Sequence, residues 1–210
     1  MNDLVEQLIL EVDKGLRFCT NSFEQHKRDY PAKDINENKL NEIEKNHSAG
    51  LMRVNHAGEV CAQALYRGQA LVCKDQKIKE HLIEAGEEET DHLVWCKKRL
   101  DELDGKESIL NPLWYAGSFA IGAIFGRYGE KVSLGFVEET EKQVVVHLDK
   151  HLNKISSKDK ATIEILKTMR EDEDTHAQQA VENGGEELEI PTKKIMKYTA
   201  KAMTSSSRYI

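Results

Sequence analysis

The sequence has little proline, few aromatic residues and no long apolar run. Its 210 residues include only 3 prolines, and aromatic side chains make up 6%. Scarce proline beside abundant Glu, Lys, Leu and Ala favours helix along the whole chain. The same balance excludes collagen-like, proline-rich and wholly disordered chains. No apolar run approaches the roughly 18 residues that cross a bilayer, and no stretch alternates polar and apolar residues as a strand would.

Positive charge is also in short supply, because 30 Lys and Arg face 37 Asp and Glu, a formal net charge of −7. Nucleic acid is therefore excluded as a partner, since phosphate contacts need clustered basic residues. The 4 cysteines form no CxxC pair, which excludes zinc-finger and thioredoxin-like sites and indicates small buried side chains in a reducing compartment. The first residues are acidic where a targeting peptide is basic. The sequence thus predicts a chain that stays in the cytoplasm or adheres to a membrane surface.

Apolar residues recur at helical spacing in most of the chain. A polar stretch at 20–48 interrupts this pattern and is interpreted as a linker with at most short helices. The four longest expected helices form two pairs, and the apolar segment between the pairs serves as a crossover. This order predicts an all-α, ferritin-like four-helix bundle with extra N- and C-terminal helices. The expected domains are 1–48 and 49–210, and the expected helices are 3–18, 49–73, 75–103, 112–126, 132–152, 158–181 and one after Pro191.

The motif Glu-x-x-His places a carboxylate and an imidazole one turn apart on one helix face, where both can bind one metal ion. It occurs at Glu89/His92, at Glu173/His176 and at Glu44/His47. A single occurrence would be weak evidence. The copy at Glu44/His47 is discarded because it lies in the polar stretch and has no glutamate 30 residues before it.

A longer spacing supports the other two copies. Glu59 precedes Glu89 by 30 residues, and Glu141 precedes Glu173 by 32 residues. That length carries a chain along one helix, round a turn and back to the same height on the next. Glu141 is preferred over its neighbouring glutamates because Val137, Val144 and Leu148 surround it at helical spacing.

Four carboxylates facing a bundle core would be costly unless they were paired or bound to metal. Two glutamates plus two Glu-x-x-His motifs from four helices is the ligand set of di-iron or di-manganese carboxylate proteins, and a structural zinc site would normally contain cysteine. The alternative is a bundle whose glutamates are merely solvated. The sequence therefore predicts a catalytic metal site made by Glu59, Glu89, His92, Glu141, Glu173 and His176.

Two further segments bear on where the protein acts. Residues 113–126 carry no charge over 14 positions, and residues 192–210 hold five basic residues and no acid. The first segment is either a buried core helix or an interfacial one. The second is either a packed helix with a basic outer face or a contact for anionic lipid. Together they favour an enzyme at a membrane surface.

Three stretches resemble the demethoxyubiquinone hydroxylases of ubiquinone biosynthesis in their bacterial form. They are Leu51-Met52-Arg53-Val54-Asn55-His56-Ala57-Gly58-Glu59, the run 87–92 (EEETDH) and the run 111–118 (NPLWYAGS). The resemblance covers the chain from about residue 49 to its C-terminus. General ferritin-like proteins share the metal ligands but not the Asn-Pro-Leu-Trp-Tyr segment.

The resemblance implies a di-iron monooxygenase bound peripherally to the cytoplasmic face of the cell membrane. Such an enzyme hydroxylates the ring of a polyprenylated methoxy-benzoquinol with dioxygen and reducing equivalents, for which NADH is a candidate source. The family's ligands fall on the same six residues, and the acids Glu88 and Asp172 are expected to hydrogen-bond a ligand histidine. A homo-oligomer is left open. The rival hypotheses are a ferroxidase or peroxide scavenger of the ferritin or rubrerythrin type, and a non-enzymatic membrane-adhering scaffold or lipid carrier.

Overall fold

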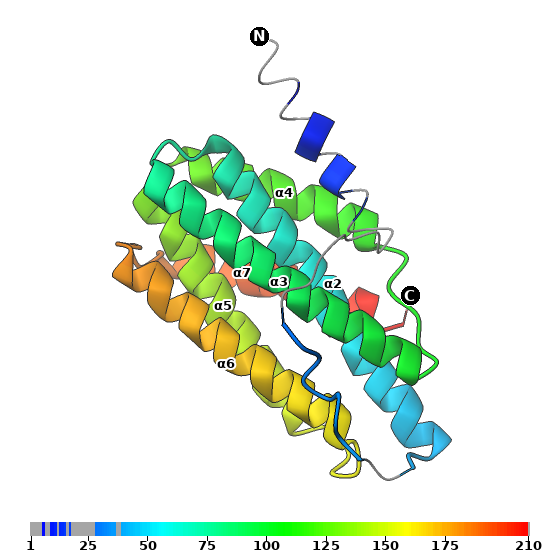
Figure 1. The fold of residues 1–210 in the computed structure, drawn as a ribbon. Coiled ribbons are helices and arrows are strands. Elements are labelled where there is room, and N and C mark those ends of the chain that lie inside the picture. Colours follow the sequence, from blue (N-terminus) through cyan, green and yellow to red (C-terminus); the bar gives the residue numbers. More distant parts are fainter. Residues whose placement is uncertain are drawn as a thin grey trace.

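The computed structural model describes most of the chain as six helices, labelled α2 to α7 in Figure 1, and shows no strand in the part that it describes. This agrees with the expected all-α class. The described residues are 6, 9–11, 13–15, 17, 28–36 and 39–209. The helices are α2 (Glu42–Val72), α3 (Gln76–Glu102), α4 (Asn111–Arg127), α5 (Glu130–Leu152), α6 (Lys160–Glu182) and α7 (Ile190–Ser207).

The four long helices α2, α3, α5 and α6 lie side by side as a bundle (Figure 1). Helix α2 packs against α3, α5 packs against α6, and the two pairs meet where α3 faces α6. The apolar helix α4 connects the pairs and packs mainly along α2, while α7 lies behind the bundle in Figure 1. The ferritin-like bundle with a long crossover is therefore confirmed.

Half of the N-terminal helix predicted for residues 3–18 lies outside the described residues. Those that are described, 6, 9–11, 13–15 and 17, are helical. Among them Glu11 accepts hydrogen bonds from the guanidinium of Arg67 on α2 at 2.7 and 2.9 Å. This part of the chain therefore lies against the bundle.

Helix α2 begins at Glu42, so the expected start at Ala49 and the expected end of the linker at residue 48 are wrong. A capping box sets the true start: the Asn41 side chain accepts from the Glu44 backbone N–H, and the Glu44 carboxylate accepts from the Asn41 backbone N–H, both at 2.9 Å. The first turns carry no apolar stripe, and Ile43 is 82% exposed, so periodicity gave no sign of them. The division of the chain into 1–48 and 49–210 stays a prediction.

The other helix ends lie within a few residues of those expected. The side chains of Asp75 and Asp159 cap α3 and α6, each accepting a backbone N–H at 3.0 Å. Pro112 occupies the first turn of α4, where its missing N–H costs nothing. Gly184, at φ 95°, follows α6 in a conformation that favours glycine, so the stop expected at Asn183-Gly184-Gly185 is confirmed.

Glycines allow α4 to approach α2 closely. A Cβ on Gly122 would clash with the Leu65 carbonyl oxygen, and a Cβ on Gly68 would clash with the Phe119 carbonyl oxygen. The helices are therefore in backbone contact here, with no room for a side chain between them. Gly126 extends this contact, because a Cβ there would crowd Val72 and Gln69 of α2.

Replacing Gly122 by alanine should lower the free energy of unfolding by about 1–3 kcal/mol, the usual cost of overpacking. Chemical denaturation followed by circular dichroism measures this. Gly117 is the matched control on the same helix, because a Cβ there meets nothing within 4 Å. Gly117→Ala should raise stability by up to about 1 kcal/mol through helix propensity. Equal effects from the two substitutions would contradict the close α2–α4 packing.

Candidate metal centre

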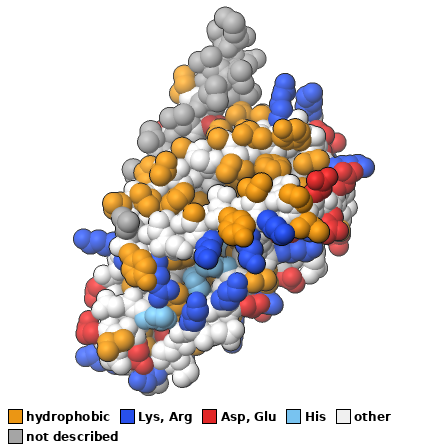
Figure 2. All heavy atoms as spheres, turned by 180° about the vertical axis from the view of Figure 1, so that it is seen from behind, with side chains coloured by type: hydrophobic (Ala, Val, Ile, Leu, Met, Phe, Trp, Pro, Cys, Tyr) orange, Lys and Arg blue, Asp and Glu red, His pale blue; other side chains and the backbone are white. Residues whose placement is uncertain are grey.

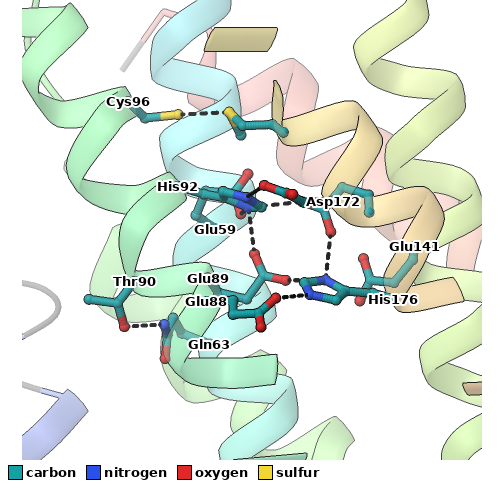
Figure 3. A network of polar contacts seen from close by, with 12 residues as sticks. Glu59, Gln63, Glu88, Glu89, Thr90, His92, Cys96, Glu141, Asp172 and His176 are labelled. Carbon is teal, nitrogen blue, oxygen red and sulfur yellow. Dashed lines mark hydrogen bonds and ion pairs between the residues drawn. The ribbon is translucent and has the colours of Figure 1, made fainter. Parts of the chain in front are cut away.

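Four helices bring six buried acids and histidines to one place in the bundle (Figure 3). Helices α2 and α5 contribute one glutamate each, while α3 and α6 contribute a glutamate and a histidine each. No member is more than 3% exposed. The six are the residues that spacing selected: Glu59, Glu89, His92, Glu141, Glu173 and His176.

His92 of α3 makes contacts on both sides of its ring. Its Nδ1 lies 3.1 Å from Glu89 Oε2 on its own helix and 3.2 Å from Glu173 Oε1 on α6. It also lies 3.8 Å from Glu59 Oε2 on α2. Its Nε2 lies 2.9 Å from Asp172 Oδ2. Because Asp172 accepts the Nε2 proton, the ring is held with Nδ1 toward the glutamates.

His176 of α6 repeats this arrangement from the opposite side. Its Nδ1 lies 3.3 Å from Glu173 Oε2 and 3.2 Å from Glu89 Oε1, and its Nε2 lies 2.8 Å from Glu88 Oε2. Each histidine therefore meets both motif glutamates and is held by the acid that precedes the other motif. The expectation that Glu88 and Asp172 hydrogen-bond a ligand histidine is confirmed, and the bonds cross between α3 and α6.

Within the part of the chain that the structure describes, one group of at least three potential ligands lies close enough to hold a metal ion. It consists of Glu59, Glu89, His92 and Glu173, whose ligand atoms all lie within 4.8 Å of one another. His176 adjoins the group through its contacts with Glu89 and Glu173. The discarded motif Glu44/His47 does not join it, although it lies on α2 rather than in a linker.

Glu141 stands slightly apart and has a partner that sequence reasoning missed. The hydroxyl of Tyr66 donates to Glu141 Oε1 at 2.8 Å, and both side chains are buried. Glu141 Oε2 has no hydrogen-bond partner among the described residues. One oxygen is thus fixed by Tyr66, and the other is unpartnered and could bind a metal ion. The signal was available, because Tyr66 follows Glu59 by seven residues and so shares its helix face.

Replacing Tyr66 by phenylalanine removes this hydrogen bond without opening a large cavity. We expect iron binding to weaken by about 10- to 100-fold, the usual cost of losing a residue that orients a metal ligand. Titration of the protein with ferrous ions under anaerobic conditions measures it. Tyr115→Phe serves as control, because Tyr115 is also buried but belongs to the α4 interface. Identical iron affinities in both variants would contradict the role of Tyr66.

Arg28, in the stretch interpreted as a linker, also reaches the centre. Its Nη1 donates to Asp172 Oδ2 at 2.6 Å, the same oxygen that accepts from His92. Its guanidinium also lies over the Trp95 ring, 4.9 Å from the ring centroid. The stretch before α2 therefore helps to position a histidine of the centre, a role that no sequence pattern indicated.

Burial and mutual repulsion favour the protonated form of two of the glutamates. Burial raises the pKa of Glu59 well above its ordinary value, and the charges of Glu89 and Glu173 raise it further. Burial likewise raises the pKa of Glu141 well above its ordinary value, again with the charges of Glu173 and Glu89 adding to the effect. Protons thus compete with any cation for these two oxygen ligands.

The pKa values of the two histidines are raised as well, but for a histidine this shift favours the charged form. Burial alone would lower the pKa of His92, but hydrogen bonds to Asp172 and Glu173 raise it well above its ordinary value. The same balance, with Glu173, Glu88 and Glu89 as partners, raises the pKa of His176. The centre therefore offers a strongly negative, buried environment that holds positive charge.

This donor set fits a pair of metal ions. Carboxylate oxygens with one imidazole per side match the preference of iron and manganese, and the absence of cysteine from the set argues against structural zinc. Glu141 Oε2 accepts no hydrogen bond from the described residues. An oxygen that is to bind a metal ion must be free in this way. A ferritin-like bundle with a buried carboxylate–histidine centre is the class of protein that fold and site define.

Comparison with known proteins narrows this class. The model of the family described as "Ubiquinone biosynthesis protein COQ7" matches residues 46–207. A 3-demethoxyubiquinol 3-hydroxylase of Legionella pneumophila (strain Lens) is 51% identical over 212 residues, covering 100% of this chain and 99% of the relative. The protein of the same name from Chromobacterium violaceum is 49% identical over 205 residues, covering 97% and 98%. The chain belongs to the COQ7 family, and the resemblance carried by its motifs is confirmed.

Proposed function

We propose that this protein hydroxylates the ring of demethoxyubiquinol, a polyprenylated methoxy-benzoquinol, in ubiquinone biosynthesis. It would use two iron ions, dioxygen and reducing equivalents, with NADH as a candidate source. The carrying observation is the crossed histidine–carboxylate centre of α3 and α6 inside a COQ7-family bundle. The named relatives are 3-demethoxyubiquinol 3-hydroxylases, and this chain matches them over nearly their full lengths.

The six buried side chains described above would hold the iron pair. Iron supplies the redox chemistry with dioxygen that protein side chains lack. Glu89 and Glu173 each contact both histidines, so each would hold metal together with both rings. Asp172 and Glu88 keep the histidine Nε2 protons in place, and Tyr66 keeps Glu141 in place.

Apolar packing around the centre would keep bulk water from the reacting atoms. Above and below the ligands lie fully buried side chains, including Met52, Trp95 and Met169 on one side and Leu82 on the other. The sulfur of Cys96 lies 3.8 Å from that of Met169. Met52, Met169 and Leu82 carry no ionisable group, and burial raises the pKa of the Cys96 thiol well above its ordinary value.

A cavity of about 10 Å³, room for a single water molecule, marks where the helices would have to part for the quinol ring to approach. It lies between α2 and α5, and its walls include Leu65, Tyr66, Phe136 and Glu141. On its outer side Phe125 of α4 packs against Phe136, with ring centroids 4.1 Å apart. A ring entering here would come from the side of α4 and reach the centre beside Glu141.

The outer face of α4 would lie on the membrane and the isoprenoid tail along it. Leu113 and Ile124 are 62% and 54% exposed, and Ala116, Gly117 and Ala120 between them are exposed too. Figure 2 shows the molecule from behind the view of Figure 1. Hydrophobic side chains gather over the upper part of this face, with Lys and Arg side chains below them. Among the described residues, no helix is long and apolar enough to cross a bilayer. These observations support peripheral attachment, which we propose is to the cytoplasmic face.

Helix α7 would add contacts to anionic lipid. Lys194, Lys197 and Lys201 are exposed along it, and Ile195 and Tyr198 between them are 66% and 71% exposed. Lysines near a membrane surface gain about 1 kcal/mol each from anionic lipids. Exposed apolar side chains beside them can enter the interface.

Membrane binding should depend on both helices in different ways. The pair Leu113→Ser and Ile124→Ser should weaken binding to all vesicles by about tenfold or more, because it removes apolar area that lipid would bury. Lys194→Gln with Lys197→Gln should remove the preference for phosphatidylglycerol over phosphatidylcholine. Co-sedimentation measures both. Ile43→Ser is the control, since Ile43 is 82% exposed and lies at the start of α2, outside both helices. If Ile43→Ser weakened vesicle binding as much as the Leu113→Ser and Ile124→Ser pair, the outer face of α4 would not be the membrane-binding face.

The quinone content of a deletion strain tests the function in the cell. We expect demethoxyubiquinone to accumulate and to disappear when the wild-type gene is restored. Normal ubiquinone combined with sensitivity to peroxide would instead support the ferritin- or rubrerythrin-type scavenger. Normal quinones without iron in the purified protein would support the non-enzymatic scaffold.

A further inference from the structure

A second cavity lies outside the metal centre, where the start of α2, the loop after α3 and the end of α7 meet. Its volume is about 530 Å³, within the usual range of small-molecule sites. Arg53 of α2, Lys106 of the loop and Arg208 at the end of α7 all line it. Three basic side chains in one cavity are notable in a chain with a net charge of −7.

Neither arginine of this cavity is neutralised by a carboxylate in the described part of the chain. Arg53 donates to two backbone carbonyls, that of Lys106 through Nε and that of Arg208 through Nη1, the latter at 2.8 Å. Arg208 Nη2 lies 3.3 Å from Nδ1 of His47. Elsewhere Arg67 and Arg170 show the common alternative, each paired with a carboxylate at 2.7 or 2.6 Å. The positive charge of the cavity is therefore available to a ligand.

The acid that lines the cavity does not cancel this charge. Asp104 pairs with the ammonium of Lys45, which lies outside the lining. His47 adds no negative charge to the cavity. Its Nδ1 accepts a hydrogen bond from Arg208, which leaves Nε2 as the protonated ring nitrogen. The cavity thus presents donors and positive charge.

We propose that this cavity binds the phosphate group of a small organic phosphate. Arginine forks match the oxygens of phosphate, and their strength comes from charge-assisted hydrogen bonds. The volume exceeds what a bare phosphate ion needs, and the Tyr209 ring, 79% exposed beside the cavity, can stack on an attached group. Gly50 and Gly105 form part of the wall.

The phosphate site lies apart from the metal centre on which the proposed function rests. Arg53 precedes Glu59 by six residues on α2, which is about 9 Å along the helix. The phosphate site and the metal centre therefore share one rigid helix but no side chain. A phosphate-bearing molecule could thus bind here while the centre holds its metal ions.

Calorimetric titration of the full-length, iron-loaded protein tests the proposal. The probes are pyrophosphate, ADP and adenosine, together with a short-chain phosphatidylglycerol kept below its micelle concentration. We expect binding by the probes that carry phosphate and none by adenosine, with affinity falling as salt rises. Tight binding of ADP would identify a soluble phosphate ester, and tight binding of the short-chain lipid a headgroup. If no phosphate probe bound, the proposal would be overturned.

Variants locate the binding. The Lys106 side chain is exposed, lines the cavity and makes no ion pair within the described chain. Lys106→Gln should therefore leave folding unaffected and lower the affinity for phosphate about three- to tenfold. Adding Arg208→Gln should lower it further. Arg127→Gln is the control, because Arg127 is exposed at the far end of α4 and does not line the cavity. Equal affinities for wild type and Lys106→Gln would contradict the assignment, even if the double variant failed to fold.

Discussion

Alanine at Glu89 or at Glu173 is expected to abolish iron loading and ring hydroxylation. Glu89 reaches His92 at 3.1 Å and His176 at 3.2 Å, and Glu173 reaches the same two rings at 3.2 and 3.3 Å. Each substitution therefore removes a carboxylate that contacts the histidines of both halves of the centre. The loss should exceed 100-fold, since changing a residue that only supports a ligand already costs about 10- to 100-fold.

Iron content by inductively coupled plasma mass spectrometry and product analysis by chromatography measure this pair of effects. Glu84→Ala and Glu171→Ala are matched controls, because both residues are exposed acids on the same two helices. Both controls should retain iron and activity. Hydroxylation of the quinol by purified Glu89→Ala or Glu173→Ala protein would refute the assigned centre.

Acidification is expected to expel iron steeply. Metal binding requires His92 and His176 to release their Nδ1 protons, and hydrogen bonds to carboxylates raise the pKa of both rings. A raised pKa means that protons compete with iron already above pH 6.5, the ordinary value for histidine. Affinity should thus fall as pH is lowered, by about 100-fold per pH unit where both rings titrate. The raised pKa values of Glu59 and Glu141 act in the same direction.

Anaerobic iron titrations at several pH values, with proton release recorded in weakly buffered solution, measure this linkage. Glu59→Gln should release fewer protons than wild type, because one titrating carboxyl is gone. Glu44→Gln, at the start of α2 and outside the ligand group, should release as many as wild type. Iron affinity that did not change with pH would contradict the proton competition described for the centre.

The bundle and its six central residues could be predicted from the sequence because both rest on helical periodicity. Glu141 is flanked by apolar residues at helical spacing, and the structure indeed buries it to 2% exposure. The spacing of Glu59 to Glu89 and of Glu141 to Glu173 correctly placed each pair at one height. Periodicity reports which face of a helix is buried, and here the buried face carries the chemistry.

Contacts that depend on how helices are turned toward each other could not be predicted in the same way. The resemblance implied that Glu88 and Asp172 would bond histidines, but the crossing of these bonds between α3 and α6 follows from packing. The role of Arg28 was not visible, because a residue without periodic neighbours gives no sign of its partner. The first turns of α2 were missed because a capping box and exposed residues, rather than an apolar stripe, define them.

Oxygen-isotope labelling tests the central claim most directly. Purified, iron-loaded protein is given a short-chain demethoxyubiquinol analogue and a reductant under oxygen-18 gas, and the product is examined by mass spectrometry. We predict that the hydroxylated quinol contains one atom of oxygen-18 from dioxygen and that Glu89→Ala forms none of it. Oxidation of ferrous ions or consumption of peroxide without a hydroxylated quinol would contradict the proposed monooxygenase.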